Sequence, residues 1–185
     1  MDVRVNESTN RFKMRGDVWV KIGAKDRNDI LETPDRCFKN LIVDVCSDLI
    51  ASWAFTGIIT NVSDHIPGIL VLAVGTGAIG WDLQNPPVET ANETQLYAEL
   101  ARKQFASKTY VDPISGNPSV SRTNIIDFMT TFLESEAVGP LVEMGLFGGS
   151  GALSTNGGTM INAKNHPVIN KPSTATLSYL WRLTF

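Results

Sequence analysis

The chain has 185 residues, of which 43% are hydrophobic and 19% are charged, and its formal net charge is −3. This length suits one domain that folds without a metal or a disulfide, and the composition is too apolar for a disordered chain. Lysine and arginine are spread along the sequence, with the densest group at residues 11–15. Nucleic-acid binding needs clustered cations, so we expect no nucleic-acid partner.

The start of the chain contains no recognisable targeting signal. Residues 1–10 are polar and lack the continuous apolar segment of a signal peptide. The longest apolar stretches, such as 66–74, are far too short to cross a bilayer. We therefore expect a soluble protein made in the cytosol, without a membrane partner. Residues 1–16 are predicted to form an irregular arm, followed by a single domain over 17–185.

The first two predicted elements differ in their hydrophobic period. Apolar and polar residues alternate over 18–24, as in a half-buried strand, and the polar cluster at 25–29 predicts a turn. Over residues 36–55 the apolar side chains instead recur at spacings of three and four, with Asp35 placed to cap the start. This pattern predicts an amphipathic helix with one buried stripe.

A glycine motif follows the next predicted strand. Residues 66–74 are apolar almost throughout, which predicts a strand buried on both faces, and Gly75-Thr-Gly77-Ala-Ile-Gly80 comes directly after it. In a dinucleotide-binding fold a helix begins inside such a motif. Here a loop over 81–89 follows, and Pro86 and Pro87 forbid that helix. We therefore interpret the motif as a glycine turn that ends a strand, and we expect no cofactor.

A second helix is predicted near the middle of the chain. Thr90 or Asn92 can cap its start, and the pattern continues through Ala106. Glu99 and Lys103 would then form an ion pair one turn apart.

The second half of the chain has the pattern of an all-β region. Hairpin-like turn residues occupy 111–118, and a glycine-rich segment at 148–158 predicts a flexible loop or hairpin tip. Strands are predicted over 123–133, 141–147, 159–163 and 177–185. The fold class is therefore mainly β (α+β), an antiparallel β-sandwich with about two packed helices.

The residues that commonly bind metals are few and scattered. His65 and His166 lie beside prolines, without a second ligand at helical or hairpin spacing, and we expect both in loops. Cys37 and Cys46 would lie on opposite faces of the first predicted helix, where they cannot bond to each other, so we interpret them as buried free thiols. No metal site is predicted.

Residues suited to catalysis also lack a supporting constellation. Ser150 lies between two glycines in the predicted mobile loop, whereas a nucleophile must be held rigidly against its base. Glu134 and Glu136 are expected in a solvated turn. Glu143 interrupts an apolar run, so either its face is exposed, or it is buried and satisfied by backbone donors or an arginine. We predict no catalytic residue.

The order of several short motifs carries a resemblance to a known family. An apolar strand leads into Gly75-Thr-Gly77, the segment 94–102 follows, and Val142-Glu143-Met-Gly145-Leu146-Phe147 comes much later. Gly158-Thr159-Met160, Asn170-Lys171-Pro172 and the strand 177–185 complete the series. Over about residues 17–185 this order resembles small virion structural proteins of tailed bacteriophages. The arm before Asp17 and the long loop at 148–157 depart from the family pattern.

The resemblance implies a non-enzymatic component of the particle, made in the host cytoplasm and assembled with copies of itself and with other virion proteins. A position on the tail, neck, baseplate or fibre is favoured over capsid decoration. A glycan- or receptor-binding module at a fibre tip is the alternative of another class, because Trp19, Trp81 and Tyr110 could stack on sugars. The residues that we expect to make assembly contacts are Arg4, Arg11, Phe12, Lys13, Trp81, Phe147 and Ser150.

Overall fold

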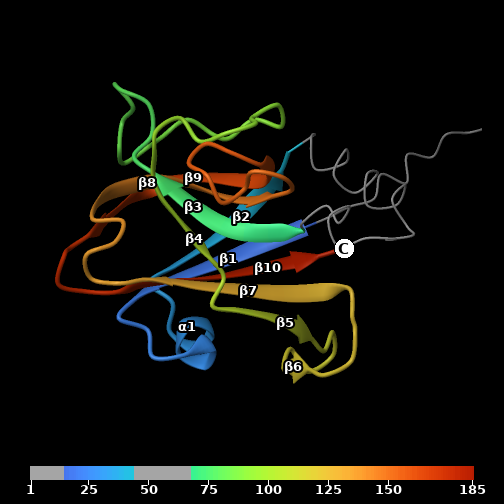
Figure 1. Ribbon diagram of the computed structural model, residues 1–185. Helices are drawn as coiled ribbons and strands as arrows, with labels where there is room; N and C mark the ends of the chain where they lie inside the picture. The colour runs from blue at the N-terminus through green and yellow to red at the C-terminus, as the bar shows by residue number, and fades with distance from the viewer. Residues whose placement is uncertain (1–14, 44–67) are drawn as a thin grey trace, which may run out of the picture.

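The computed structural model of the chain describes residues 15–43 and 68–185, which form one antiparallel β structure with a single short helix in these ranges (Figure 1). The first elements are β1 (Arg15–Ile22), α1 (Arg27–Glu32), β2 (Arg36–Ile42), β3 (Ile69–Gly75), β4 (Glu99–Gln104) and β5 (Ser107–Val111). They are followed by β6 (Pro118–Ser119), β7 (Ile125–Phe132), β8 (Gly139–Gly148), β9 (Thr159–Lys171) and β10 (Leu177–Thr184).

The ten strands form one sheet in the order β4-β3-β8-β9-β2-β1-β10-β7-β5-β6. The sheet folds over at β2, so that β3, β8 and β9 face β1, β10 and β7 across a shared core (Figure 1). The mainly-β antiparallel class is therefore confirmed, although the expected sandwich is one continuous open sheet. The expected pair of packed helices is wrong, because the described residues contain only α1.

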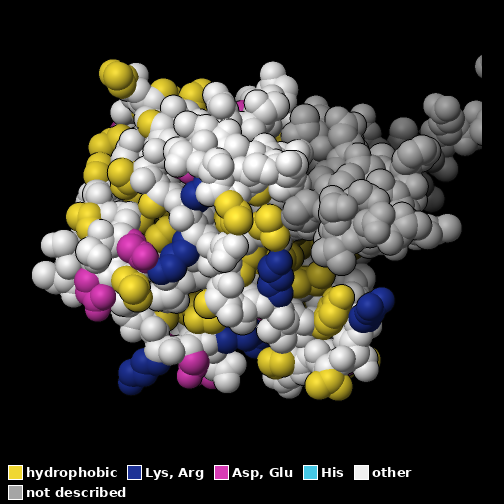
Figure 2. Space-filling model, in the orientation of Figure 1, with side chains coloured by type: hydrophobic (Ala, Val, Ile, Leu, Met, Phe, Trp, Pro, Cys, Tyr) yellow, Lys and Arg dark blue, Asp and Glu magenta, His cyan; other side chains and the backbone are white. Residues whose placement is uncertain are grey.

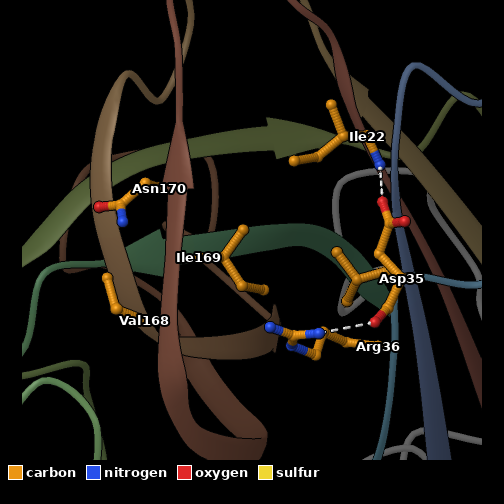
Figure 3. Close-up of a pocket in the computed structure, with 7 residues that line it drawn as sticks. Ile22, Asp35, Arg36, Val168, Ile169 and Asn170 are labelled. Atoms are coloured by element: carbon orange, nitrogen blue, oxygen red, sulfur yellow. Dashed lines mark hydrogen bonds between the residues drawn. The ribbon is translucent and has the colours of Figure 1, made fainter.

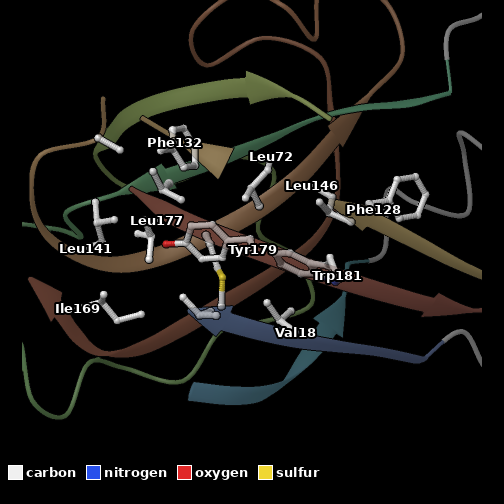
Figure 4. Packing of buried hydrophobic residues seen from close by; sticks show 14 of the residues in the cluster. Val18, Leu72, Phe128, Phe132, Leu141, Leu146, Ile169, Leu177, Tyr179 and Trp181 are labelled. Carbon is white, nitrogen blue, oxygen red and sulfur yellow. The ribbon is translucent and has the colours of Figure 1, made fainter. Parts of the chain in front are cut away.

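The core lies between the two halves of the sheet. Tyr179 and Trp181 of β10 are fully buried at its centre, with Val18 of β1 on one side and Leu72 and Leu146 on the other (Figure 4). Burial of side chains this large contributes roughly 2 kcal/mol each. The predicted final strand is confirmed, and β10 lies between β1 and β7 in the sheet.

The chain bridges the two ends of the fold at the junction of β4 and β5. Ala106 donates its backbone N–H to Met129 of β7 at 2.7 Å, and the rings of Phe105 and Phe128 lie 5.0 Å apart. Lys108 reaches back to the backbone oxygen of Ile69 at 2.7 Å. The segment that joins β4 to β5 thus links the β4 edge of the sheet to β7, although β4 and β7 are not neighbours in the hydrogen-bonded strand order.

A second apolar cluster covers the outer face of β3, β8 and β9. Val71, Ala73 and Phe147 point outward from the sheet and pack against Leu96 and Ala152, which come from two loops. β3 is therefore buried on both faces, as predicted. These two loops, over residues 76–98 and 149–158, form an outer layer on this half of the fold.

Both sequence-predicted helices are wrong where the structure describes them. Residues 36–42 form β2, which pairs with β1, and residues 44–55 of the predicted helix, with Cys46, lie outside the described residues. Residues 99–104 form β4, which pairs with β3. A helix does form at 27–32, overlapping the turn that was expected at 25–29, with the Asp26 carboxylate accepting the N–H of Asp29 as an N-cap.

The remaining differences concern single positions. β1 begins at Arg15, so residues 15 and 16, assigned above to the arm, belong to a strand. Cys37 is exposed rather than buried. His166 is fully buried within β9 instead of lying in a loop, and His65 lies outside the described residues.

Candidate functional site

Glu143 of β8 anchors the outer loop over residues 76–98 from both of its ends. Its carboxylate is buried and accepts the backbone N–H groups of Gly77, Tyr97 and Ala98 at 3.0, 2.8 and 2.8 Å. Of the alternatives open at the sequence level, burial with backbone donors is confirmed. Three charge-assisted hydrogen bonds compensate for removing this carboxylate from water.

The glycine motif makes this contact possible. A Cβ on Gly75 would lie 2.4 Å from Oε1 of Glu143, so only glycine permits the carboxylate to approach. Gly77 has a φ of +73°, and the Trp81 ring packs against it. No helix begins here, which confirms the interpretation as a turn that ends β3. The anion bound by Gly77 is therefore a side chain of the same protein.

A second carboxylate fastens the middle of the 76–98 loop to β9. Glu89 accepts Lys164 Nζ at 2.8 Å and the backbone N–H of Asn165 at 3.2 Å. Val168 donates its N–H to the backbone oxygen of Leu83 at 2.8 Å. The predicted irregular loop at 81–89 is confirmed, and it is attached along β9 rather than projecting free.

An aromatic pair lies at the surface of the same loop. The rings of Trp81 and Tyr97 meet edge to face with centroids 4.8 Å apart, and Tyr97 is 54% exposed. Beside Tyr97 is an open pocket of about 370 Å³ with a largely polar lining. Its lining residues are Thr90, Asn92, Glu93, Thr94, Gln95, Leu96 and Tyr97. Partial burial, and then the Glu93 carboxylate, raise the pKa of the Tyr97 phenol.

A buried ion pair holds the glycine-rich tip at 149–158. Arg102 pairs with both oxygens of Glu99, at 2.6 and 2.5 Å, and donates to the backbone oxygens of Ala152 and Gly157. The guanidinium also lies 4.7 Å from the centre of the Phe147 ring. This segment is a hairpin tip, as one of the two predicted alternatives had it, and it is fastened to β4.

The β5–β6 hairpin presents apolar side chains to solvent. Asp112 fixes the turn, because its carboxylate accepts the N–H groups of Ser115 and Ile114 at 2.7 and 3.0 Å, bonds that lower the Asp112 pKa. Arg27 of α1 donates to the backbone oxygen of Gly116 at 3.2 Å. Hydrophobic side chains gather over this hairpin in Figure 2. We call the exposed residues Pro113, Ile114, Pro118 and Val120 the hairpin patch.

A groove of about 530 Å³ opens between the start of β2 and the end of β9 (Figure 3). It forms because the register between these strands contains only Leu41 with Ala163 and Ile42 with Asn162. We call this opening the β9 groove. Its apolar lining comes from Val20, Ile22, Val168 and Ile169, and its polar lining from Asp35, Arg36 and Asn170.

Asp35 and His166 beside this groove have structural roles. Asp35, which was expected to cap a helix, instead accepts the backbone N–H of Ile22 at 2.7 Å. His166 stacks on Phe38 at 5.1 Å, and burial lowers its pKa to about 4, so the imidazole is neutral at pH 7. Within residues 15–43 and 68–185, no three His, Cys, Asp or Glu side chains are grouped as metal ligands.

The residues expected to make assembly contacts lie in different environments. Phe147 is buried beneath Arg102. Ser150 is exposed at the hairpin tip, and Trp81 is half-buried in the aromatic pair. The other four, Arg4, Arg11, Phe12 and Lys13, lie outside the described residues.

Sequence reasoning missed the hairpin patch and the β9 groove. Isoleucine and valine within a Pro-, Ser- and Asn-rich turn segment were the available signal for the first. The groove had no sequence signal, because it depends on strand order.

Comparison with known proteins adds no relative: no protein-family model matches the chain, and no curated protein matches it significantly. Among the described residues, no helix is both long and apolar enough to span a bilayer.

Proposed function

We propose that this chain is a non-enzymatic structural protein of a tailed-bacteriophage virion, made in the host cytoplasm and assembled in multiple copies on the tail, neck, baseplate or fibre. Capsid decoration is the second position compatible with the same chemistry. The motif order described above supports the viral assignment. The presence on one chain of an exposed apolar patch and of a groove with a partly apolar wall carries the proposal of self-assembly.

The hairpin patch and the β9 groove lie at opposite ends of the same strands. Tyr110 of the hairpin pairs with Ile126, and Ile126 with Leu183, which is level with Gly16 of β1. The groove is lined by Ile22, six residues further along β1, or roughly 20 Å away. A contact between two such different surfaces is head-to-tail and repeats from copy to copy, giving a ring or a filament.

The two surfaces share exposed apolar side chains. Ile114 and Val120 are 96% and 106% exposed, and packing them against Ile22 and Val168 at the wall of the groove would remove apolar area from water on both copies. β6 has two residues and begins with Pro118, which weakens strand addition at this edge. Side-chain insertion is therefore favoured over extension of the sheet.

Sedimentation of the full chain over a range of concentrations tests this contact. We expect the average mass of the unmodified protein to rise with concentration. The double variant Ile114→Asp, Val120→Asp should stay at the mass of a monomer. Ile22→Asp in the β9 groove should do the same. Leu153→Asp, at another exposed site, is the matched control and should self-associate normally.

Mixing the two monomeric variants gives the sharpest result. The hairpin variant keeps its groove and the groove variant keeps its hairpin, so one head-to-tail contact can form and a dimer is expected. A monomeric unmodified chain at every concentration, or no dimer on mixing, would contradict the contact. Imaging of particles that contain the chain, with its density located on the tail, neck or capsid, tests the viral assignment separately.

A further inference from the structure

The geometry points to a binding site for a neutral saccharide at the pocket beside Tyr97, formed by the aromatic ring and the polar side chains of residues 90–97. The site is independent of the hairpin patch and the β9 groove, and the inference does not rest on self-assembly. It identifies a ligand class for a surface that assembly through the other two sites leaves open.

The aromatic ring at this site is exposed but held in position. Tyr97 is more than half exposed, while its backbone N–H is bound by the buried Glu143 carboxylate. The preceding residue, Leu96, is only 4% exposed and packs in the outer apolar cluster. Trp81 supports one side of the ring. A ligand that stacks on Tyr97 therefore meets a preorganised surface, which lowers the entropy cost of binding.

The lining of the pocket selects polyhydroxylated molecules. Asn92, Thr94 and Gln95 are exposed and carry amide or hydroxyl groups that both donate and accept hydrogen bonds. Pyranose rings combine apolar C–H faces with hydroxyl groups, and so match an aromatic ring bordered by such side chains. The volume of about 370 Å³ is in the range of small-ligand pockets and suits one or two sugar rings.

The charge of the site favours neutral sugars over acidic ones. Glu93 contributes its carboxylate to the lining, where it accepts the N–H of Thr90 at 2.9 Å. No lysine or arginine of the described residues forms an ion pair with Glu93. A sugar carboxylate would therefore meet an unneutralised negative charge, which disfavours uronic acids.

Saturation-transfer NMR on the full chain tests the site, with glucose, galactose, N-acetylglucosamine and their disaccharides as neutral probes and glucuronate as the acidic one. We expect saturable binding of at least one neutral probe with a Kd of about 1 mM, typical of a single small contact surface, and weaker binding of glucuronate. The same titration should change the fluorescence of Trp81, which touches Tyr97.

Variants at Tyr97 separate the site from adventitious binding. Tyr97→Ala should weaken binding by about tenfold, while Tyr97→Phe, which keeps the ring, should bind within about twofold of the unmodified chain. Tyr110→Ala, on the other half of the fold, is the control and should bind normally. Absence of saturable binding of every neutral probe up to roughly 50 mM, or equal binding by Tyr97→Ala, overturns the inference. Self-association measured on Tyr97→Ala keeps this result distinct from the assembly contact.

Discussion

The carboxylate of Glu143 accepts the backbone N–H of Gly77 at 3.0 Å, although the two residues are 66 positions apart in the sequence. The same carboxylate binds the N–H groups of Tyr97 and Ala98, so one side chain fixes both ends of the 76–98 loop. The 76–98 loop is therefore held in place by a buried side chain of β8. The loop needs no regular secondary structure of its own for this anchoring.

Glu143→Ala should destabilise the protein by about 3 kcal/mol or more, because three backbone donors lose a charged acceptor in a buried setting. Urea unfolding measures the loss, and hydrogen exchange should locate it in residues 76–98. Glu134→Ala, at an exposed turn, is the control and should change stability by less than about 0.5 kcal/mol. Unchanged exchange in the loop would contradict the anchoring role.

Arg102→Met should cost about 3–5 kcal/mol, since it leaves the carboxylate of Glu99 buried without its cation. The side chains of Arg102 and Glu99 are only 6% and 1% exposed. Adding Glu99→Gln to this variant should recover part of the stability, which a double-mutant cycle measures. Lys103→Met removes the neighbouring, more exposed pair with Glu136 and should cost at most about 1 kcal/mol. Equal losses of stability in Arg102→Met and Lys103→Met would argue against a special role of the Arg102–Glu99 pair in holding the 149–158 tip.

The two helix predictions failed because strand pairing overrode local preference. Residues 99–104 are good helix formers, yet β3 needs a partner, and the Glu143 contacts hold Tyr97 and Ala98 where β4 must begin. In the extended chain, Ala101 and Phe105 face the core. Glu99 then pairs with Arg102, and Lys103 with Glu136, in place of the expected helical pair.

The first helix prediction shows the same ambiguity of period. Phe38 and Ile42 are four residues apart, so they fit one helix face and also alternate positions of a strand. The antiparallel pairing of Phe38 with Val18 favours the strand. That pairing joins distant parts of the chain, so the local hydrophobic pattern does not reveal it. Strands with strong alternation, such as β1 and β10, were predictable because apolar side chains recur at every second position of their sequences.

The candidate sites differed in how far the sequence revealed them. The pattern of Glu143 in an apolar run limited its role to a few alternatives, one of which is correct. The Tyr97 pocket and the β9 groove combine residues positioned by tertiary contacts. The polar composition of residues 90–97 was visible in the sequence, but the placement of Tyr97 depends on the Glu143 anchor. The groove had no sequence signal, because it depends on the strand order.

Stability should fall in acid because of His166. Its pKa is about 4 in the folded protein and about 6.5 when unfolded, so the unfolded chain binds more protons between these values. The contribution of the neutral, buried His166 to the free energy of unfolding is complete above pH 6.5. It is lost as the pH falls to 4, for a total of roughly 3 kcal/mol. Lys164 and Arg36 nearby also disfavour the charged imidazole, while Glu89 opposes them.

Urea unfolding at several pH values, compared between the unmodified chain and His166→Phe, isolates this contribution from the carboxylates that titrate in the same range. The variant keeps an aromatic ring against Phe38 and should lose most of the slope between pH 6.5 and 4. Identical slopes for the two proteins would mean that His166 is protonated in the folded state or exposed there.

Removal of residues 177–185 should prevent folding, because β10 pairs along its length with β1 on one side and β7 on the other. Trp181→Ala is the milder test and should cost about 3–5 kcal/mol, since its side chain is fully buried at the centre of the core. Phe185→Ala, at the partly buried end of the chain, should cost clearly less than Trp181→Ala. Solubility of the truncated chain and urea unfolding of the two variants measure these effects. A soluble truncated chain with a cooperative transition would mean that the other nine strands suffice, and would remove β10 from the centre of the fold.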